Sequence, residues 1–185
     1  MKAFRQRRSS LRSVCAALAS VLATGCLDLT SIEVPPEISS GVRFPITLHV
    51  MADSDLTANG FLGVLTPEDW SVAAEGYGGY AAGRLGPSRS CSAWLEFNDP
   101  APEGCRWTGF VTDRALTGRG AYHADLYLVP DDRSGDRRLV FVVGACDGPA
   151  GSRWEELDRR EVWVQLVGDA GTVRLSWGRL KALNG

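Results

Sequence analysis

The sequence predicts a single all-β domain, an antiparallel β-sandwich of about eight or nine strands. Short segments of alternating apolar and polar residues recur along the chain, and turn residues such as Gly, Asp, Asn and Pro separate them. Glycine accounts for 21 of the 185 residues, and 44% of all residues are hydrophobic, which is a globular composition. A small closed β-barrel is the alternative architecture for the same strand pattern.

Residues 42–50 give the clearest strand signal. Five apolar side chains share one face of this segment, while Arg43, Thr47 and His49 share the other. This period of two predicts a strand with one buried face. Asn59-Gly60 then provides a turn, and residues 61–65 form the next predicted strand.

Further strand candidates follow, separated by turns. Residues 139–145 are apolar on both faces, which predicts a central strand covered on both sides. In residues 172–180, Val173, Leu175 and Trp177 share one face. The remaining candidates are residues 92–97, 106–112, 122–129 and 162–167.

Two segments carry helix-start signals. Residues 66–69, Thr-Pro-Glu-Asp, place Thr at an N-cap and Pro at the first helical position. Because Trp70, Val72 and Ala74 then alternate, we expect a turn and a strand there instead. Residues 152–155, Ser-Arg-Trp-Glu, have the spacing of a capping box, which predicts a short helix as an open alternative.

Pro67, Trp70 and Val72 have the spacing Pro-x-x-Trp-x-Val. From Ile46 onward this stretch resembles a strand–turn–strand unit of bacterial extracellular immunoglobulin-like domains. The resemblance implies an immunoglobulin-like sandwich, with a role in adhesion, spacing or accessory binding.

The first 25 residues have the three parts of an export signal. Residues 2–12 carry five basic side chains, and no acidic residue precedes Asp28. Residues 14–23 are apolar but too short to span a bilayer, which takes about 20 residues. Arg7-Arg8 partly resembles a twin-arginine signal, so export after folding is an alternative to export of the unfolded chain.

Residues 22–26, Leu-Ala-Thr-Gly-Cys, resemble the lipobox of bacterial lipoproteins. The resemblance implies cleavage before Cys26 and a diacylglycerol on its thiol, and two or more acyl chains anchor a protein stably. Leu22 stands one residue earlier than the usual Leu, and an ordinary secretory signal is the alternative. Leu27, where an Asp would retain a lipoprotein in the inner membrane, favours the outer membrane within the cell envelope.

We therefore expect three parts: a signal peptide at 1–25, a lipidated cysteine with a flexible tether at 26–41, and one β-sandwich domain at 42–185. Pro35-Pro36 predicts an extended spacer, which Ser39-Ser40-Gly41 would close. Without the leader the chain keeps 15 basic and 22 acidic residues, a net charge near −7. This acidic balance argues against a nucleic-acid partner, which needs clustered Lys and Arg.

Three cysteines remain in the predicted domain, within an oxidising compartment. Cys91–Cys105 closes the shortest loop and would add roughly 3 kcal/mol to stability. Cys105–Cys146 is the alternative disulfide. We expect no metal site, because these cysteines lack a CxxC spacing or a nearby histidine.

No catalytic motif accompanies the only two histidines, His49 and His123. We therefore expect neither enzymatic activity nor a cofactor. The leading hypothesis is a non-catalytic envelope lipoprotein that binds or spaces something outside the cytoplasm, with an envelope protein or a glycan as its partner. The alternatives are a lipocalin-like carrier of an apolar ligand and a carbohydrate-binding accessory domain. Exposed aromatic rings stack on sugars, and the candidate residues are Trp94, Trp107, Tyr77 and Tyr80.

Overall fold

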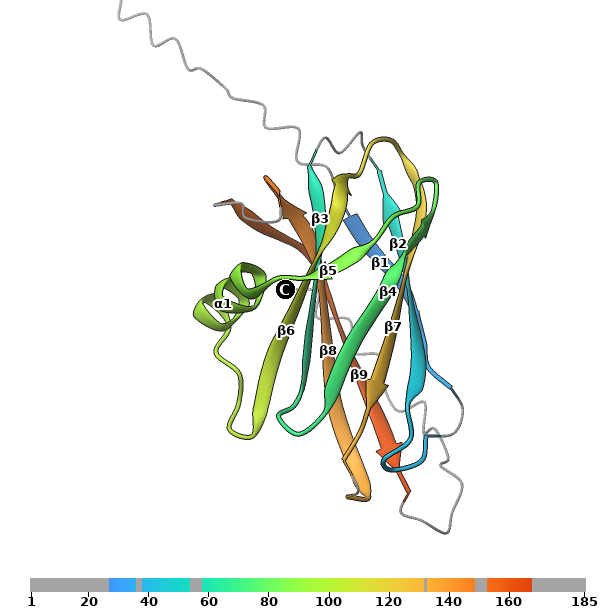
Figure 1. Ribbon diagram of the computed structural model, residues 1–185, viewed down its shortest axis with the longest axis vertical. Helices are drawn as coiled ribbons and strands as arrows, with labels where there is room; N and C mark the ends of the chain where they lie inside the picture. Colours follow the sequence, from blue (N-terminus) through green and yellow to red (C-terminus); the bar gives the residue numbers. More distant parts are fainter. Residues whose placement is uncertain (1–26, 36–37, 54–57, 132, 149–152, 168–185) are drawn as a thin grey trace, which may run out of the picture.

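The computed structural model describes residues 27–35, 38–53, 58–131, 133–148 and 153–167, which form two packed antiparallel sheets and one outer helix, α1 (Arg89–Asn98) (Figure 1). The predicted antiparallel β-sandwich is confirmed. The closed-barrel alternative is wrong, because the described strands form two separate sheets. In spatial order, one sheet contains β1 (Leu27–Glu33), β2 (Phe44–Ala52), β7 (Gly120–Val129) and β4 (Ser71–Gly79), and the other contains β5 (Leu85–Pro87), β6 (Cys105–Ala115), β3 (Asn59–Pro67), β8 (Gly135–Cys146) and β9 (Trp154–Leu166).

The main core lies between the two sheets. Ile46 and Leu48 of β2 and Phe141 of β8 are fully buried there, as the alternating pattern of residues 42–50 predicted. Trp70 closes one end of this core: its ring packs edge-on against Phe44 at 6.1 Å between centroids, and its Nε1 donates a hydrogen bond to Asp131. This burial with a satisfied indole N–H gives Trp70 a structural role.

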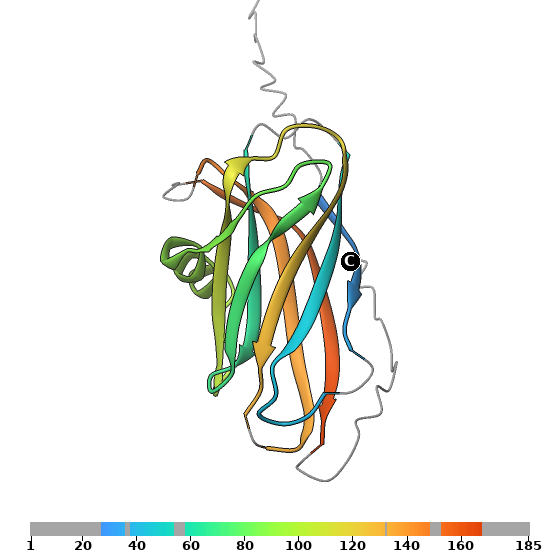
Figure 2. The same cartoon turned by 45° about the vertical axis from the view of Figure 1, so that its right-hand side comes forward.

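Helix α1 covers the outer face of the five-stranded sheet (Figure 2). Gly63 of β3 and Gly109 of β6 lie directly opposite each other beneath it. A Cβ atom on Gly63 would lie 2.5 Å from Leu95 Cδ1, and one on Gly109 would lie 2.6 Å from Cys91 Cβ. The two glycines therefore allow the helix to approach the sheet closely.

The prediction of a strand at residues 92–97 is wrong, because this segment belongs to α1. Ser88 caps the helix, since its Oγ accepts a hydrogen bond from the backbone N–H of Cys91. Cys91 and Leu95, four residues apart, are the buried positions of the helix. Among the described residues, no helix is long and apolar enough to span a membrane.

The prediction of a central strand at residues 139–145 is confirmed. Strand β8 lies between β3 and β9, and both of its faces are buried. Phe141 and Val143 face the other sheet, whereas Val140 and Val142 belong to the outer cluster beneath α1.

The prediction of a flexible tether at residues 26–41 is wrong for residues 27–33, which form β1. Leu29 is fully buried in the main core. Its backbone N–H donates to Asp158 Oδ2, and its carbonyl accepts from Arg160 Nε, so β9 side chains hold this edge strand. The short Leu-x-Leu alternation gives only a weak local signal, and distant residues supply the remaining contacts.

The helix alternative at residues 152–155 is wrong for its described part, because Trp154 begins the long strand β9. Strand β9 pairs along nearly its whole length with β8, which extends the predicted strand at 162–167 toward the N-terminus. Cys26, the leader and the predicted strand at 172–180 lie outside the described residues.

Candidate functional site

An aromatic surface lies beside helix α1 on the outer face of the five-stranded sheet. Trp94 of α1 and Trp154 of β9 are both partly exposed, and their rings stack with centroids 6.4 Å apart. Each indole also packs edge-on against Phe61 beneath them, at 5.5 Å. Phe97, one helical turn after Trp94, is 85% exposed. We call Trp94, Phe97 and Trp154 the α1 surface.

Charged side chains lie at the C-terminal end of the helix. Arg159 of β9 donates from Nε and Nη2 to both carboxylate oxygens of Glu156, and from Nη1 to Asp99. Burial alone would lower the pKa of Arg159, but the hydrogen bonds with Glu156 and Asp99 raise it. The guanidinium therefore stays charged and ties the end of the helix to β9.

The four predicted sugar-stacking residues do not form one site. Trp107 is only 6% exposed, and its Nε1 donates to the backbone carbonyl of Asp99. Tyr77 is buried in the main core, whereas Tyr80 is exposed at the end of the sandwich where β4 finishes. Of the four, only Trp94 belongs to the α1 surface.

Phe97 was not predicted from the sequence, whereas Trp154, which lies near a turn where an exposed ring could stack on a sugar, was considered but was not among the four candidate residues. Phe97 lay in the segment assigned to a strand, and Trp154 lay in the segment that carried a capping-box signal. A helix capped at Ser88 would have placed Trp94 and Phe97 on neighbouring positions of one face, since residues three apart are neighbours on a helix. No local signal links Trp154 to them, because that contact joins segments far apart in the chain.

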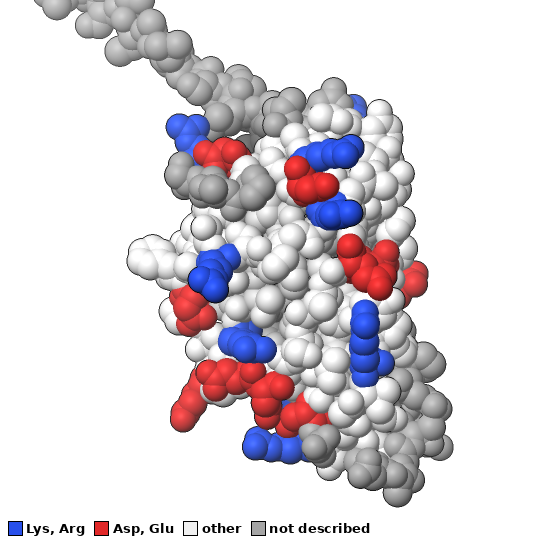
Figure 3. All heavy atoms as spheres, in the orientation of Figure 1, with Lys and Arg blue, Asp and Glu red and all other residues white. Residues whose placement is uncertain are grey.

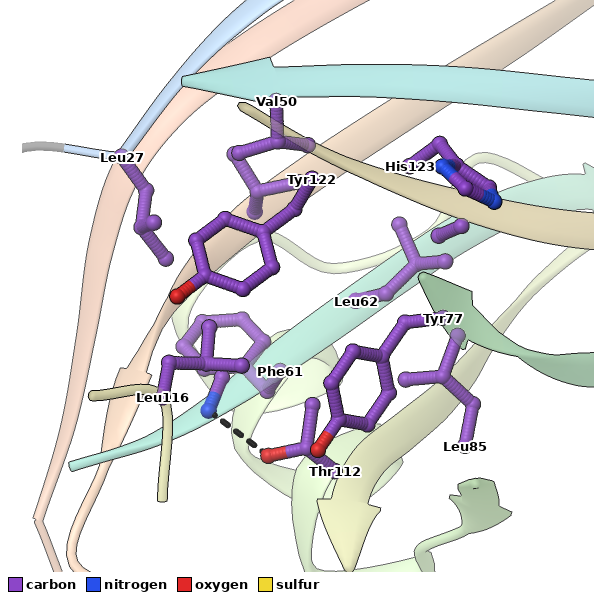
Figure 4. A pocket seen from close by; sticks show the side chains of 13 residues that line it. Leu27, Val50, Phe61, Leu62, Tyr77, Leu85, Thr112, Leu116, Tyr122 and His123 are labelled. Atoms are coloured by element: carbon purple, nitrogen blue, oxygen red, sulfur yellow. Dashed lines mark hydrogen bonds between the residues drawn. The ribbon is translucent and has the colours of Figure 1, made fainter. Parts of the chain in front are cut away.

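An apolar cavity of about 50 Å³ lies between the sheets, lined by Leu27, Leu62, Tyr77 and Tyr122 among others (Figure 4). The hydroxyl of Tyr122 donates to the carbonyl of Gly118. Burial raises the pKa of both tyrosines, and Asp113 raises that of Tyr77 further. Ligand pockets usually have volumes of roughly 300–1,000 Å³. This cavity is therefore too small for the apolar ligand of a lipocalin-like carrier, and the two separate sheets of the described strands do not form the closed barrel that this alternative assumed.

Neither predicted disulfide is present, because all three described cysteines are free thiols. Cys91 packs against Gly109, whereas Cys105 lies four residues away along β6, or about 13 Å at the usual rise per residue. Cys105 pairs with Pro67 and Cys146 with Asn59, at opposite ends of β3. A disulfide needs Cα atoms within about 7 Å, so the strand register separates these thiols too widely.

Burial is the main cause that raises the pKa of Cys91, to about 12, and nearby Cys146 adds to the effect. We expect iodoacetamide at about pH 8 to leave Cys91 unmodified in the folded protein, since the thiolate is the nucleophile. The pKa of Cys91 is higher in the folded protein than the ordinary value of 9.0, so the unfolded chain loses this proton first as the pH rises. The free energy of unfolding should therefore decrease between about pH 9 and pH 12. Peptide mass mapping checks the labelling, with unfolded protein as the control. Rapid modification of Cys91 in the folded state would contradict the expectation.

The two histidines lie opposite each other on β2 and β7, on the outer face of the four-stranded sheet. His49 Nε2 is 2.9 Å from Glu33 Oε1, and His123 Nε2 is 3.7 Å from Asp125 Oδ2. Within the described ranges, no group of three or more His, Cys, Asp or Glu side chains is arranged to hold a metal ion. Each imidazole instead has one carboxylate neighbour on a solvent-exposed sheet face.

No protein-family model and no curated protein sequence matches the chain. Among solved structures, it resembles AvmM, which catalyses macrocyclization in alchivemycin A biosynthesis, at 13% identity and a TM-score of 0.48, over 80% of this chain and 90% of that one. It also resembles a cohesin module from a Clostridium perfringens family 33 glycoside hydrolase, at 13% identity and a TM-score of 0.43, over 79% and 98%. A third is the major pilin SpaD of Corynebacterium diphtheriae, at 8% identity and a TM-score of 0.47, over 75% and 34%. At such low similarity these proteins give no guide to function.

Proposed function

We propose that the chain is the precursor of a lipid-anchored envelope protein whose β-sandwich is a non-catalytic binding module. The observation that carries the proposal is that the folded domain already includes the residue after the cysteine of the lipobox-like segment. Leu27 belongs to strand β1, is buried, and pairs with Ala52 of β2.

The burial of Leu27 and Leu29 supports cleavage before Cys26 and not later. Leu27 and Leu29 belong to the main core, so a cut after either would remove core side chains. Loss of a buried leucine side chain costs roughly 2–5 kcal/mol. Cleavage before Cys26 retains the whole of β1. Intact mass spectrometry of the membrane-extracted protein tests the proposal: it should show residue 26 as the N-terminus, with the added mass of its acyl chains.

We assign binding of a protein partner to the α1 surface. Exposed Phe97 beside Trp94 resembles the aromatic anchors that dominate protein interfaces. A photo-cross-linking residue at position 97 should give a discrete adduct in cells that position 42, exposed elsewhere, does not give. The adduct should weaken when Trp94 is replaced by alanine. Identical adduct patterns at positions 97 and 42 would contradict a partner site on this surface.

Carbohydrate binding is the second candidate, and the stacked pair of Trp94 and Trp154 favours it. We expect Trp154→Ala to lower binding to any glycan recognised on an array by about two- to tenfold, because stacking on one ring contributes about 0.5–1.5 kcal/mol. Trp163→Ala, which changes another exposed tryptophan, is the matched control. If the unaltered protein binds no glycan on the array, this candidate is excluded.

A further inference from the structure

Strand β4 has an unpaired edge. It is the last strand of the four-stranded sheet, and among the described strands it pairs only with β7. Near the end of β4, Tyr77 exchanges two backbone hydrogen bonds with Gly83 on the side away from β7. Residues 71–75 have no backbone partner on that side within the described ranges. We call residues 71–75 the free edge.

The other three edge strands of the two sheets are protected against pairing. In β1, side chains of β9 bind both the backbone N–H and the carbonyl of Leu29. Strand β5 has only three residues, ends at Pro87 and leads directly into α1. In β9, residues 155–161 are charged at every position but Leu157. Short strands, proline and charged side chains are usual means by which sheet edges avoid pairing.

The free edge has none of these protections before its last residue. Residues 71–74 are Ser-Val-Ala-Ala, without charge or proline, and an uncharged area covers the lower part of β4 in Figure 3, which has the orientation of Figure 1. Val72 and Ala74 pack against the main core but stay partly exposed. A strand added here would complete their burial and bind the open backbone groups, as in β-strand addition.

The pairing of β4 with β7 shows which backbone groups are open. Residues of an antiparallel pair alternate between those that bond to the neighbouring strand and those that do not. Tyr77 directs its N–H and its carbonyl away from β7. One extra residue interrupts the ladder between Ala74 and Gly76. With this interruption counted, the alternation also directs the N–H and carbonyl groups of Val72 and Ala74 away from β7.

We infer that the free edges of two copies of this chain pair antiparallel about a two-fold axis through Ala73. Val72 of each copy then lies opposite Ala74 of the other, so the open backbone groups bond to each other in both directions. The two four-stranded sheets become one continuous sheet. The same surface serves both copies, which is the isologous arrangement of a two-fold dimer. This pairing is independent of the proposed acylation.

The charges of the free edge suit a second copy in this register. Glu75, its only charged residue, lies opposite Ser71 and not opposite another Glu75, so like charges do not meet directly across the axis. The register also brings Glu75 toward the start of the other copy's β4. There Arg106 Nη2 donates to the carbonyl of Trp70, and Arg106 forms no ion pair with any residue that the structure describes.

Carboxylates also lie near the start of β4, in the turn between β3 and β4. Asp69 is 4.0 Å from the guanidinium of Arg133, and Glu68 is its neighbour in the chain. Glu75 is itself 3.8 Å from Arg43 in its own copy. Each end of the paired segment therefore joins charges of both signs, and Arg106 is the cation that has no carboxylate partner before a second copy binds.

Cysteine cross-linking tests the register. Ala73 would lie opposite Ala73 of the second copy as a non-hydrogen-bonded pair, with Cα atoms about 4.5 Å apart. A disulfide spans Cα separations of about 4.4–6.8 Å. We expect Ala73→Cys in the full chain to give a disulfide-linked dimer on a non-reducing gel after mild oxidation of the cells that make it. The matched control is Ala121→Cys, at an exposed alanine of β7, which should give several-fold less dimer.

Charge exchange at the same position tests the pairing itself. Two differently tagged copies of the full chain, made in one cell, should co-purify. Ala73→Lys in both copies should lower the recovery several-fold, because like charges then lie directly opposite each other. Ala73→Lys in one copy with Ala73→Glu in the other should restore it. Because Ala73 is exposed, such a rescue also shows that both variants fold.

The results separate a second copy from other occupants of the free edge. More cross-linked dimer at position 73 than at position 121, together with rescue by the opposite charges, supports the two-fold pair. Equal dimer at both positions overturns it. Loss of co-purification that the opposite charges do not restore overturns the register about Ala73. A cysteine at position 73 that cross-links only to a different protein overturns the second copy as the occupant.

Discussion

Replacement of Cys26 by serine should abolish acylation and release the protein from the membrane fraction. A serine hydroxyl does not replace the thiol to which the diacylglycerol would be attached. Each buried CH₂ group of an acyl chain contributes about 0.8 kcal/mol to membrane binding, so loss of two or more chains removes the dominant attraction. Intact mass and detergent phase partitioning measure the two effects. The expected result is loss of the acyl mass and a shift of nearly all the protein to the aqueous phase.

The matched control for this experiment is Cys15→Ser. Cys15 lies within the predicted leader, so this variant should give the same processed mass and the same partitioning as the unaltered chain. A Cys26→Ser product that is still processed and still partitions with the membrane would refute the anchor.

Replacement of Leu29 by alanine should destabilise the domain by about 2–5 kcal/mol. Leu29 is fully buried against the core, and its backbone is bound by Asp158 and Arg160 of β9. In a domain of this size, 1 kcal/mol lowers Tm by roughly 2–4 °C, so the expected decrease is about 4–20 °C. Chemical denaturation and thermal unfolding monitored by circular dichroism measure it.

Thr30→Ala provides the comparison within the same strand. Thr30 is exposed, and its hydroxyl makes one hydrogen bond, to the carbonyl of His49. The expected cost is about 1 kcal/mol or less. Equal, small effects of the two substitutions would mean that residues 27–33 act as a tether after all, and that the domain starts later in the chain.

The sequence predicted those elements whose signal is local and regular. Residues 42–50 alternate and residues 139–145 are apolar on both faces, so β2 buries one face from Phe44 onward and β8 buries both; Val42, predicted on the buried face, precedes β2 and is exposed. Helix α1 was missed because its buried positions, Cys91 and Leu95, are too few to establish a helical period. The packing of α1 on the sheet depends on Gly63 of β3 and Gly109 of β6, which lie outside the helix segment.

The candidate surface was predicted only in part. Trp94 was among the candidates, but nothing local distinguishes it from Trp107, which lies beneath the end of α1 and donates a hydrogen bond to the carbonyl of Asp99. Local sequence likewise does not show which cysteines lie close enough to pair. Their spacing permits a disulfide between Cys91 and Cys105, whereas the strand register and the helix place the two thiols apart.

By itself, the sequence determined the β-sandwich class, because alternation of apolar and polar residues is a property of residues adjacent in the chain; the leader and the lipid anchor remain predictions of the same local kind. Only the tertiary structure decided which aromatic rings are exposed, that Cys105 lies far from Cys91 and Cys146, and that Leu27 and Leu29 belong to the core. These features depend on contacts between distant segments, such as the hydrogen bond from Leu29 to Asp158, 129 residues away. The energy of such contacts arises only when the sheets pack together, and no local pattern encodes it.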